Sequence, residues 1–149
     1  PYFATVTYTE AQQLSDSSST DAESIFAGGF AGARIPYVPQ WLVQFGTGLH
    51  FTDRFGVDVT GTYQSEMFTT ASNVRNQINP VTGLPDSRFG VTDSFFVWDL
   101  SAYAYVSSNW KLFGGVQNLF DRRYITTRHP HGPRPALPLF GYLGAEAVY

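Results

Sequence analysis

Residues 128–134 are the part of this chain best suited to bind an anion. They read Arg-His-Pro-His-Gly-Pro-Arg, which places Arg128, His129, His131 and Arg134 close together. A guanidinium presents a rigid, planar fork of donors that matches a carboxylate. The prolines and the glycine indicate a loop at this point. The segment therefore predicts a loop that can hold an anionic ligand such as a ferric carboxylate complex.

A second long polar stretch, residues 65–92, carries further residues of the same kinds. They are Asn73, Arg75, Gln77 and Arg88. We expect these donors and residues 128–134 to converge on one ligand-binding opening. A single arginine or histidine on a loop is usually only hydrated, so the prediction concerns the two loops as a group.

The sequence offers little for catalysis or for a resident metal. His129 and His131 lack a third partner at metal-ligand spacing. There is no cysteine, which excludes a thiolate nucleophile, a disulfide and a cysteine-based zinc site. Neither Gly-x-Ser-x-Gly nor His-Glu-x-x-His occurs, and no triad is specified. We therefore expect no enzymatic activity and no directly bound cofactor.

Composition narrows the class of protein further. Charged residues make up 14%, where about a quarter is usual, and aromatic residues make up 17%. The net charge of −3 and the lack of any lysine or arginine run give no surface for nucleic acid. No run of apolar residues is long enough for a transmembrane helix. Alternating transmembrane strands would still fit the mean hydropathy of −0.14.

Alternation of apolar and polar residues predicts an all-β protein with about six antiparallel strands in a meander. The clearest example pairs Phe55, Val57 and Val59 on one face with Asp58 and Thr60 on the other. The expected strands are residues 2–9, 41–51, 54–64, 95–106, 110–124 and 139–149. Each strand would have one apolar face and one face of charged, hydroxyl and glycine residues.

The lengths of the connections discriminate between two kinds of β protein. Periodicity alone fits either a soluble sandwich, whose apolar face is a core, or a barrel, whose apolar face meets lipid. Long irregular stretches at 10–35, 65–92 and 125–138 alternate with short turns at 52–53 and 107–109. Outer-membrane barrels show this alternation, with short periplasmic turns and long outer loops. The pattern favours a transmembrane barrel.

The last third of the chain resembles the C-terminal end of TonB-dependent outer-membrane receptors. The motif consists of Asn118, Leu119, Phe120 and Asp121, followed by Tyr124, a loop rich in glycine, proline and arginine, and a last strand ending on an aromatic residue. Segments 32–39, 63–73 and 124–132 make the chain most similar to the ferric-dicitrate type of iron-chelate receptor. Two departures are Pro138-Leu139, where the family usually has Pro-Arg, and a final tyrosine, where it usually has phenylalanine.

This resemblance implies a role and a set of partners. Residues 1–149 would be the C-terminal segment of a 22-stranded barrel in the Gram-negative outer membrane, with the plug domain and earlier strands outside this sequence. The outer loops of the receptor would capture a ferric chelate, and the TonB–ExbB–ExbD complex would drive its import. The C-terminus would be periplasmic. The barrel-assembly machinery would recognise one face of the last strand, formed by Leu143, Ala145, Ala147 and Tyr149.

Two other interpretations remain open from the sequence. One is a soluble β-sandwich that binds carbohydrate through its many aromatic residues. The other is a small outer-membrane barrel, a pore or an enzyme, that is completed by oligomerisation. Six strands are too few to close alone, because single-chain barrels begin at about 8 strands, and lipid does not tolerate open sheet edges.

Overall fold

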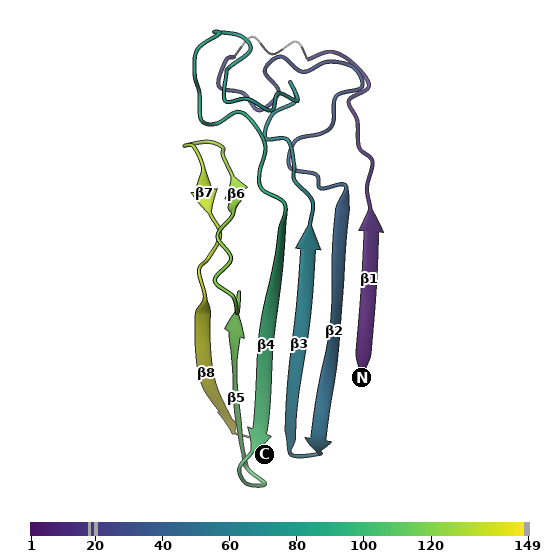
Figure 1. Ribbon diagram of the computed structural model, residues 1–149, viewed down its shortest axis with the longest axis vertical. Helices are drawn as coiled ribbons and strands as arrows, with labels where there is room; N and C mark the ends of the chain where they lie inside the picture. Colours follow the sequence, from purple (N-terminus) through teal and green to yellow (C-terminus); the bar gives the residue numbers. More distant parts are fainter. Residues whose placement is uncertain (18, 20, 148–149) are drawn as a thin grey trace.

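The computed structural model describes residues 1–17, 19 and 21–147. Its main element is a six-stranded antiparallel sheet with the order β1-β2-β3-β4-β5-β8 (Figure 1). Its strands are β1 (Tyr2–Tyr8), β2 (Trp41–Thr52), β3 (Phe55–Gln64), β4 (Phe95–Tyr105), β5 (Trp110–Gln117) and β8 (Phe140–Ala147). Between β5 and β8, a ribbon of β6 (Ile125–Thr127) and β7 (Arg134–Pro135) extends beyond the sheet. The predicted six-stranded meander is confirmed.

The pairing register collects the apolar residues of all six strands on one face. Val59 of β3 lies opposite Thr47 of β2 and Leu100 of β4. Residues directly opposite in antiparallel strands share a face, so the predicted apolar sets coincide across the sheet. Phe45, Phe96 and Trp98 form an aromatic cluster on this face, with ring centroids 5.2–6.0 Å apart. We call this surface the apolar face.

Nothing in the described part of the chain covers the apolar face. Leu143 is 85% exposed, Val6 63% and Leu49 59%. Each strand of the sheet contacts only its pairing neighbours, so the sheet is a single layer. The alternative of a soluble β-sandwich is wrong for the described residues, because a sandwich needs a second sheet against this face. None of the described residues forms a helix long and apolar enough to cross a membrane.

The opposite face carries charged and aromatic side chains near the short turns. Lys111 Nζ lies 3.4 Å from Glu146 on β8 and 5.7 Å from the centre of the Tyr103 ring on β4. His50 Nε2 lies 3.6 Å from Asp58 on the neighbouring strand. These residues pair with partners across strands. We call this surface the polar face.

The long and short connections lie at opposite ends of the sheet (Figure 1). Residues 53–54 and 106–109 join strands at one end, and residues 9–40, 65–94 and 118–139 lie at the other. The buried apolar side chains of the described residues belong to the long loops and not to the strands: Ala27, Ala33, Met67, Ala71 and Phe89. The packed core of this chain is therefore in its loops.

Strand β5 is shorter than the sequence predicts. It ends at Gln117, whereas the sequence predicts a strand that continues to residue 124. Asn118 and Asp121 adopt positive φ angles of 51° and 48°, which end the extended backbone. At the other end of the sheet, β8 follows the predicted last strand as far as Ala147. Tyr149, the predicted final residue of the assembly signal, lies outside the described residues.

Candidate ligand-binding loop cap

The three long loops, residues 9–40, 65–94 and 118–139, pack into one unit that we call the loop cap. Tyr37 joins the first loop to the third. Its hydroxyl oxygen accepts hydrogen bonds from the backbone nitrogens of Arg128, at 3.2 Å, and His129, at 3.0 Å. The Thr127 hydroxyl donates a third, at 3.2 Å. One side chain therefore holds the start of the predicted anion-binding segment.

Asn73, a predicted ligand residue, joins the first two loops. Its Oδ1 accepts the backbone nitrogen of Arg34 at 2.7 Å, and its Nδ2 donates to the Arg34 carbonyl at 3.0 Å. The residue has a φ of 50°, a conformation that asparagine adopts more readily than most residues. Nearby, Asn79 Nδ2 donates to the Ala22 carbonyl at 2.8 Å. The amide of Asn73 is thus committed to loop packing.

Arg75 forms an ion pair with Glu66, and its guanidinium lies 5.7 Å from the centre of the Phe68 ring. The hydrogen bond to Glu66 raises the pKa of Arg75. The guanidinium of Arg34 lies 5.8 Å from the same ring. Arg75 remains 64% exposed, so it can contact solvent or a ligand while it is paired.

Arg88 is enclosed by two carboxylates. It donates to Asp86 at 2.8–3.2 Å through Nε and Nη2 and lies 3.1 Å from Glu23 of the first loop. Its hydrogen bonds hold the pKa of Asp86 down to about 2, and Asp86 in turn raises the pKa of Arg88. The charge of Arg88 is therefore largely balanced within the cap.

Arg128 and His129 anchor the third loop on the second. Arg128 is 8% exposed, and its guanidinium donates to the carbonyls of Val91, at 2.8 Å, and Ser87, at 3.2 Å. The His129 ring meets Phe89 edge to face, with centroids 6.1 Å apart. Its Nε2 is buried and has no hydrogen-bond partner among the described residues. Burial, and then the nearby Arg88 charge, lower the pKa of His129, so the neutral ring is favoured.

Gly90 marks a place where the second and third loops approach each other closely. A Cβ at this position would lie 3.3 Å from the Arg75 carbonyl, 3.7 Å from Gln77 and 3.8 Å from Arg128 Nε. With its φ of 111°, Gly90 adopts a backbone conformation that side chains disfavour. The second and third loops thus meet at Gly90, where Arg75 contributes its backbone carbonyl and not its guanidinium. Asn73 lies instead at the junction with the first loop.

Four predicted residues stay at the surface of the cap. They are Arg75, Gln77, His131 and Arg134, all of which are exposed. The structure thus divides the predicted set into residues that hold the loops together and residues that can reach a ligand. Among the described residues, no group of three or more His, Cys, Asp or Glu side chains could hold a metal ion.

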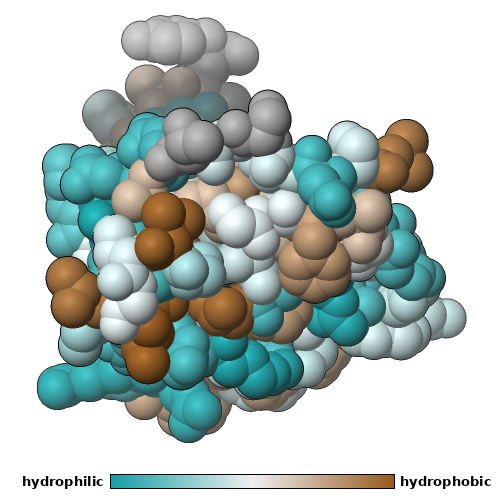
Figure 2. Space-filling view, turned by 90° about the horizontal axis from the view of Figure 1, so that it is seen from above, coloured by the Kyte–Doolittle hydropathy of each residue, from teal (hydrophilic) through white to brown (hydrophobic). Residues whose placement is uncertain are grey.

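The outer surface of the cap mixes hydrophilic and apolar side chains. Figure 2 shows this end from above, with brown apolar groups among teal ones. The tip of the second loop contributes Ile78, Val81 and Leu84, which are 41%, 50% and 65% exposed. Such a surface can meet a ligand that has both apolar and charged parts.

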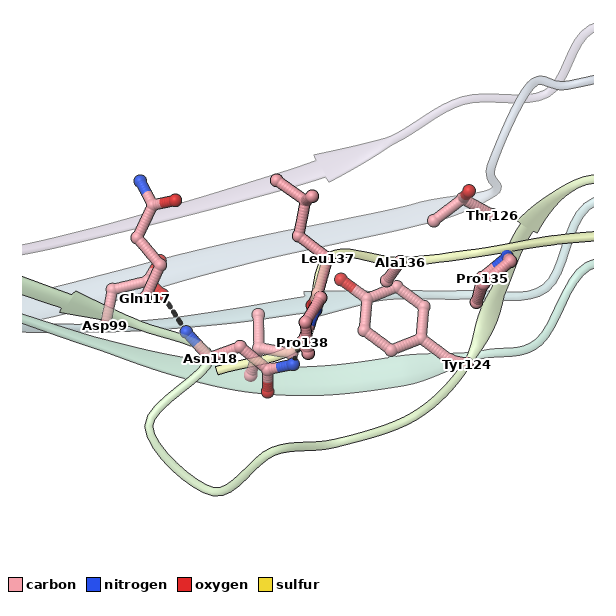
Figure 3. A pocket seen from close by; sticks show the side chains of 10 residues that line it. Asp99, Gln117, Asn118, Tyr124, Thr126, Pro135, Ala136, Leu137 and Pro138 are labelled. Carbon is pink, nitrogen blue, oxygen red and sulfur yellow. Dashed lines mark hydrogen bonds between the residues drawn. The ribbon is translucent and has the colours of Figure 1, made fainter. Parts of the chain in front are cut away.

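Beneath the third loop, a pocket of about 440 Å³ opens on the polar face (Figure 3). Its walls include Asp99, Gln117, Tyr124 and Thr126. Tyr124 stacks on Phe95 with centroids 4.1 Å apart. Burial and the nearby Asp99 raise the pKa of Tyr124. The pocket is lined by the motif tyrosine and by strand residues of the polar face.

The motif residues Asn118 to Asp121 form a turn that borders this pocket. Asn118 Oδ1 accepts the Arg122 backbone nitrogen at 2.8 Å, and its Nδ2 donates to the Arg122 carbonyl at 2.9 Å. Nδ2 also reaches the Leu137 carbonyl at 3.1 Å. Asp121 Oδ1 accepts the Leu139 backbone nitrogen at 3.1 Å. Leu119 is half-buried and Phe120 is exposed. The motif therefore fixes the crossing from the sheet to the third loop.

The described residues of the assembly signal share the apolar face with β5. Leu143, Ala145 and Ala147 lie opposite Gly114, Leu112 and Trp110. This is the arrangement that alternation predicts.

Sequence reasoning did not identify the residues that hold the cap together. Tyr37, Glu66, Phe68 and Asp86 are the clearest examples, because each is the partner of a predicted residue. The signal at Tyr37 is its place between Pro36 and Pro39, which marks a fixed turn. Partners from distant loops leave no periodic pattern, so the other three give no comparable signal.

Comparisons with known proteins identify the family. The family model described as TonB dependent receptor-like, beta-barrel, matches residues 2–119. A comparison with curated proteins gives no match. The siderophore receptor PiuA from Acinetobacter baumannii is similar over 97% of this chain and 18% of its own, with 20% identity and a TM-score of 0.71.

Two further solved receptors share the fold. The ferric citrate transporter FecA in its unliganded form covers 79% of this chain with 18% of its own, at 19% identity and a TM-score of 0.65. The ferric-catecholate import receptor Fiu from E. coli K12, in its open form, covers 75% with 16%, at 24% identity and a TM-score of 0.59. The chain thus spans less than a fifth of the length of each receptor.

The family match covers most of the chain, and the single-layer sheet with its exposed apolar face agrees with it. The family consists of outer-membrane transport receptors of Gram-negative bacteria, and these are not enzymes. The chain belongs to the TonB-dependent receptor family and forms part of its β-barrel.

Proposed function

We propose that this chain supplies part of the ligand-capturing mouth of a receptor that imports a ferric chelate. The similar solved receptors are described as a siderophore receptor, a ferric citrate transporter and a ferric-catecholate import receptor. Two of these descriptions name a ferric complex, and the third names a siderophore. No iron–protein bond is needed, because the iron arrives already coordinated. The ferric chelate is cargo and not a resident cofactor.

The observation that carries this proposal is the packing of the cap around Gly90. The Arg75 carbonyl and the Gln77 side chain of the second loop, and Arg128 Nε of the third, all lie within 3.8 Å of a Cβ built on Gly90. Buried contacts, among them the Arg128 bonds to Val91 and Ser87, hold the loops in place. A binding surface ordered in advance loses less entropy when it captures a ligand. The exposed donors on this framework are Gln77, His131 and Arg134, together with the accessible side of Arg75.

We further propose how the chain lies in the membrane. The loop cap faces the exterior, and the short turns and the C-terminal end of β8 face the periplasm, as in barrels with long outer loops. Residues 1–149 form the C-terminal segment of a 22-stranded barrel. The plug domain and the contact with the TonB–ExbB–ExbD complex belong to the rest of the receptor. The barrel-assembly machinery recognises one face of the last strand, formed by Leu143, Ala145, Ala147 and Tyr149.

Ferric citrate binding to the full receptor tests the role of the cap. A double variant, His131→Ala with Arg134→Gln, removes two exposed donors without touching the buried contacts of Arg128. We expect the dissociation constant for ferric citrate or a ferric catecholate to rise by about tenfold or more, because hydrogen bonds between charged groups are lost. Isothermal titration with each chelate measures this change.

The matched control is Arg54→Gln, at an exposed arginine on the short turn before β3. We expect this variant to bind as the unaltered receptor does. If the double variant binds both chelates as tightly as the control, the cap does not capture a ferric chelate through these residues.

A further inference from the structure

The turn after β5 projects from the sheet on one side. In Figure 3 the backbone between Asn118 and Tyr124 bows away from the side toward which the Gln117 and Leu137 side chains point. Asn118 closes this bow through its two hydrogen bonds to the backbone of Arg122. Gln117 lies on the polar face, because it lines the same pocket as Asp99. The bow, residues 118–123, therefore projects on the apolar side.

Pairing places the bow at the level of the upper aromatic residues of the apolar face. The Leu119 backbone nitrogen donates to the Trp98 carbonyl at 2.8 Å. Phe96 precedes Trp98 by two residues on β4 and therefore lies closer to the loop cap, opposite Tyr63 of β3. Aromatic residues at the ends of transmembrane strands sit at the boundary between acyl chains and head groups. The bow thus lies at the membrane boundary nearest the loop cap.

Arg122 borders two hollows. One, of about 380 Å³, is lined by Tyr63, Ser94, Phe95, Phe96 and Arg122. The other, of about 370 Å³, is lined by Arg122, Arg123, Pro135, Ala136 and Pro138. Tyr63 and Phe96 lie opposite each other on the apolar face, so the first hollow brings Arg122 close to the face that we assign to lipid.

The charges of this pair are largely free. Within the described chain, the Arg122 side chain has no hydrogen bond or ion pair. Arg123 has one distant partner, Asp121, at 3.7 Å, and its side chain is 88% exposed. Phe120, also within the bow, is 72% exposed. The bow thus carries an exposed aromatic ring and two arginines within four residues of the chain.

We propose that Arg122 and Arg123 bind a phosphate group of an outer-leaflet lipid, with Phe120 inserted among its acyl chains. Guanidinium forks suit phosphate oxygens, and an aromatic side chain beside them suits the head-group boundary. The proposal rests on the membrane orientation given above and not on the identity of the cargo. It assigns the bow a partner that differs from the ligand of the cap.

The test uses the full receptor, purified in a neutral detergent and mixed with diphosphoryl lipid A, its fully dephosphorylated form or phosphatidylcholine. Native mass spectrometry counts the lipid retained by each barrel. We expect the unaltered receptor to retain the diphosphoryl lipid in preference to the other two. The double variant Arg122→Gln with Arg123→Gln should bind it about tenfold to thirtyfold more weakly, since each cation near a membrane surface contributes to anionic lipid binding.

Two controls separate a lipid site from loss of fold and from the cap. Arg122→Lys with Arg123→Lys keeps both charges and should retain most of the binding, and Arg54→Gln should retain all of it. Ferric citrate binding should be the same in the unaltered receptor and in the double variant Arg122→Gln with Arg123→Gln. Loss of lipid binding can therefore be told apart from loss of ligand binding by the cap. Equal retention of all three lipids by the unaltered receptor overturns the proposal. So does equal retention of the diphosphoryl lipid by the glutamine and unaltered forms.

Discussion

The hydroxyl oxygen of Tyr37 lies 3.0 Å from the backbone nitrogen of His129, 92 positions later in the chain. This contact fastens the first long loop to the third where the predicted anion-binding segment begins. Arg128 fastens the same segment to the second loop. The residues that make the cap one body are therefore the neighbours of those that would touch a ligand. We therefore expect a change that loosens the cap also to weaken ligand binding.

Replacing Tyr37 by phenylalanine should loosen the third loop. The ring remains, but the donors of Thr127, Arg128 and His129 lose their shared acceptor. A buried donor left without a partner costs about 1–3 kcal/mol. Backbone amides 128 and 129 should then exchange hydrogen about tenfold to a hundredfold faster.

Exchange followed by mass spectrometry on the full receptor measures this effect. Tyr105→Phe, at the short-turn end of β4, is the matched control and should leave residues 128 and 129 unchanged. Unaltered exchange at these two amides in Tyr37→Phe would show that the hydroxyl does not hold the loop.

Two substitutions at Asn118 should separate backbone strain from lost hydrogen bonds. Asn118→Gly tolerates the φ of 51° but loses the side-chain bonds to Arg122 and Leu137. Asn118→Ala loses the same bonds and adds strain of about 1 kcal/mol. The folded receptor keeps a compact gel mobility up to a certain temperature. We expect this temperature to fall in both variants, and to fall more in Asn118→Ala than in Asn118→Gly.

Asn76→Ala, at an exposed asparagine of the second loop, controls for the loss of an amide as such. A glycine variant less stable than the alanine variant would contradict the strain assigned to this turn.

Acidification should release the third loop through His129. Burial holds the pKa of His129 below its ordinary value of 6.5, so the released loop binds a proton more readily than the packed one. The packed state is therefore fully favoured above about pH 6.5 and loses stability as the pH falls from there through the lowered pKa. The facing charges are Arg88, which opposes protonation, and Asp86, which favours it.

A nitroxide label attached through His131→Cys reports this release as increased mobility in the full receptor. The same label combined with His129→Gln should show no change as the pH falls from 7.5 to 5. Asp86 contributes in a separate window: its pKa is about 2 instead of 3.8, so its stabilising effect is lost only as the pH falls from 3.8 toward 2. An equal rise in mobility above pH 5 with and without His129 would contradict the assignment.

Alternation of side chains was sufficient to predict the sheet. In β3, the sequence places Val57 and Val59 opposite Asp58 and Thr60, and the register keeps that division across the neighbouring strands. Such a pattern depends only on the two-residue repeat of an extended chain. The lengths of the connections likewise predicted which end of the sheet carries the loops.

Two local features did not follow from alternation. Residues 118–124 resemble a strand because Leu119 and Phe120 are apolar, but the positive φ angles of Asn118 and Asp121 end it. The prolines and glycine around the β6–β7 ribbon predict a loop, whereas the structure has two short strands there. Its available signal is the run Ile125-Thr126-Thr127, which is β-branched throughout.

The contacts within the cap depend on long-range partners. Asn73 and Arg34 are 39 positions apart, and Arg128 and Ser87 are 41 positions apart. A single sequence does not indicate which of two loop residues will meet. It did not predict that Arg88 and Arg128 would be occupied by loop packing.

The central claim is that the apolar face of the sheet touches lipid while the polar face turns to an enclosed interior. The chain has no cysteine, so labels attached at Val59→Cys, Leu100→Cys, Thr60→Cys and Ser101→Cys report single sites within it. In the full receptor reconstituted in liposomes, spin labels at 59 and 100 should collide far more with oxygen than with a polar nickel chelate. Labels at 60 and 101 should show no such preference for oxygen. Equal behaviour at the two pairs, or the reverse preference, would contradict the account.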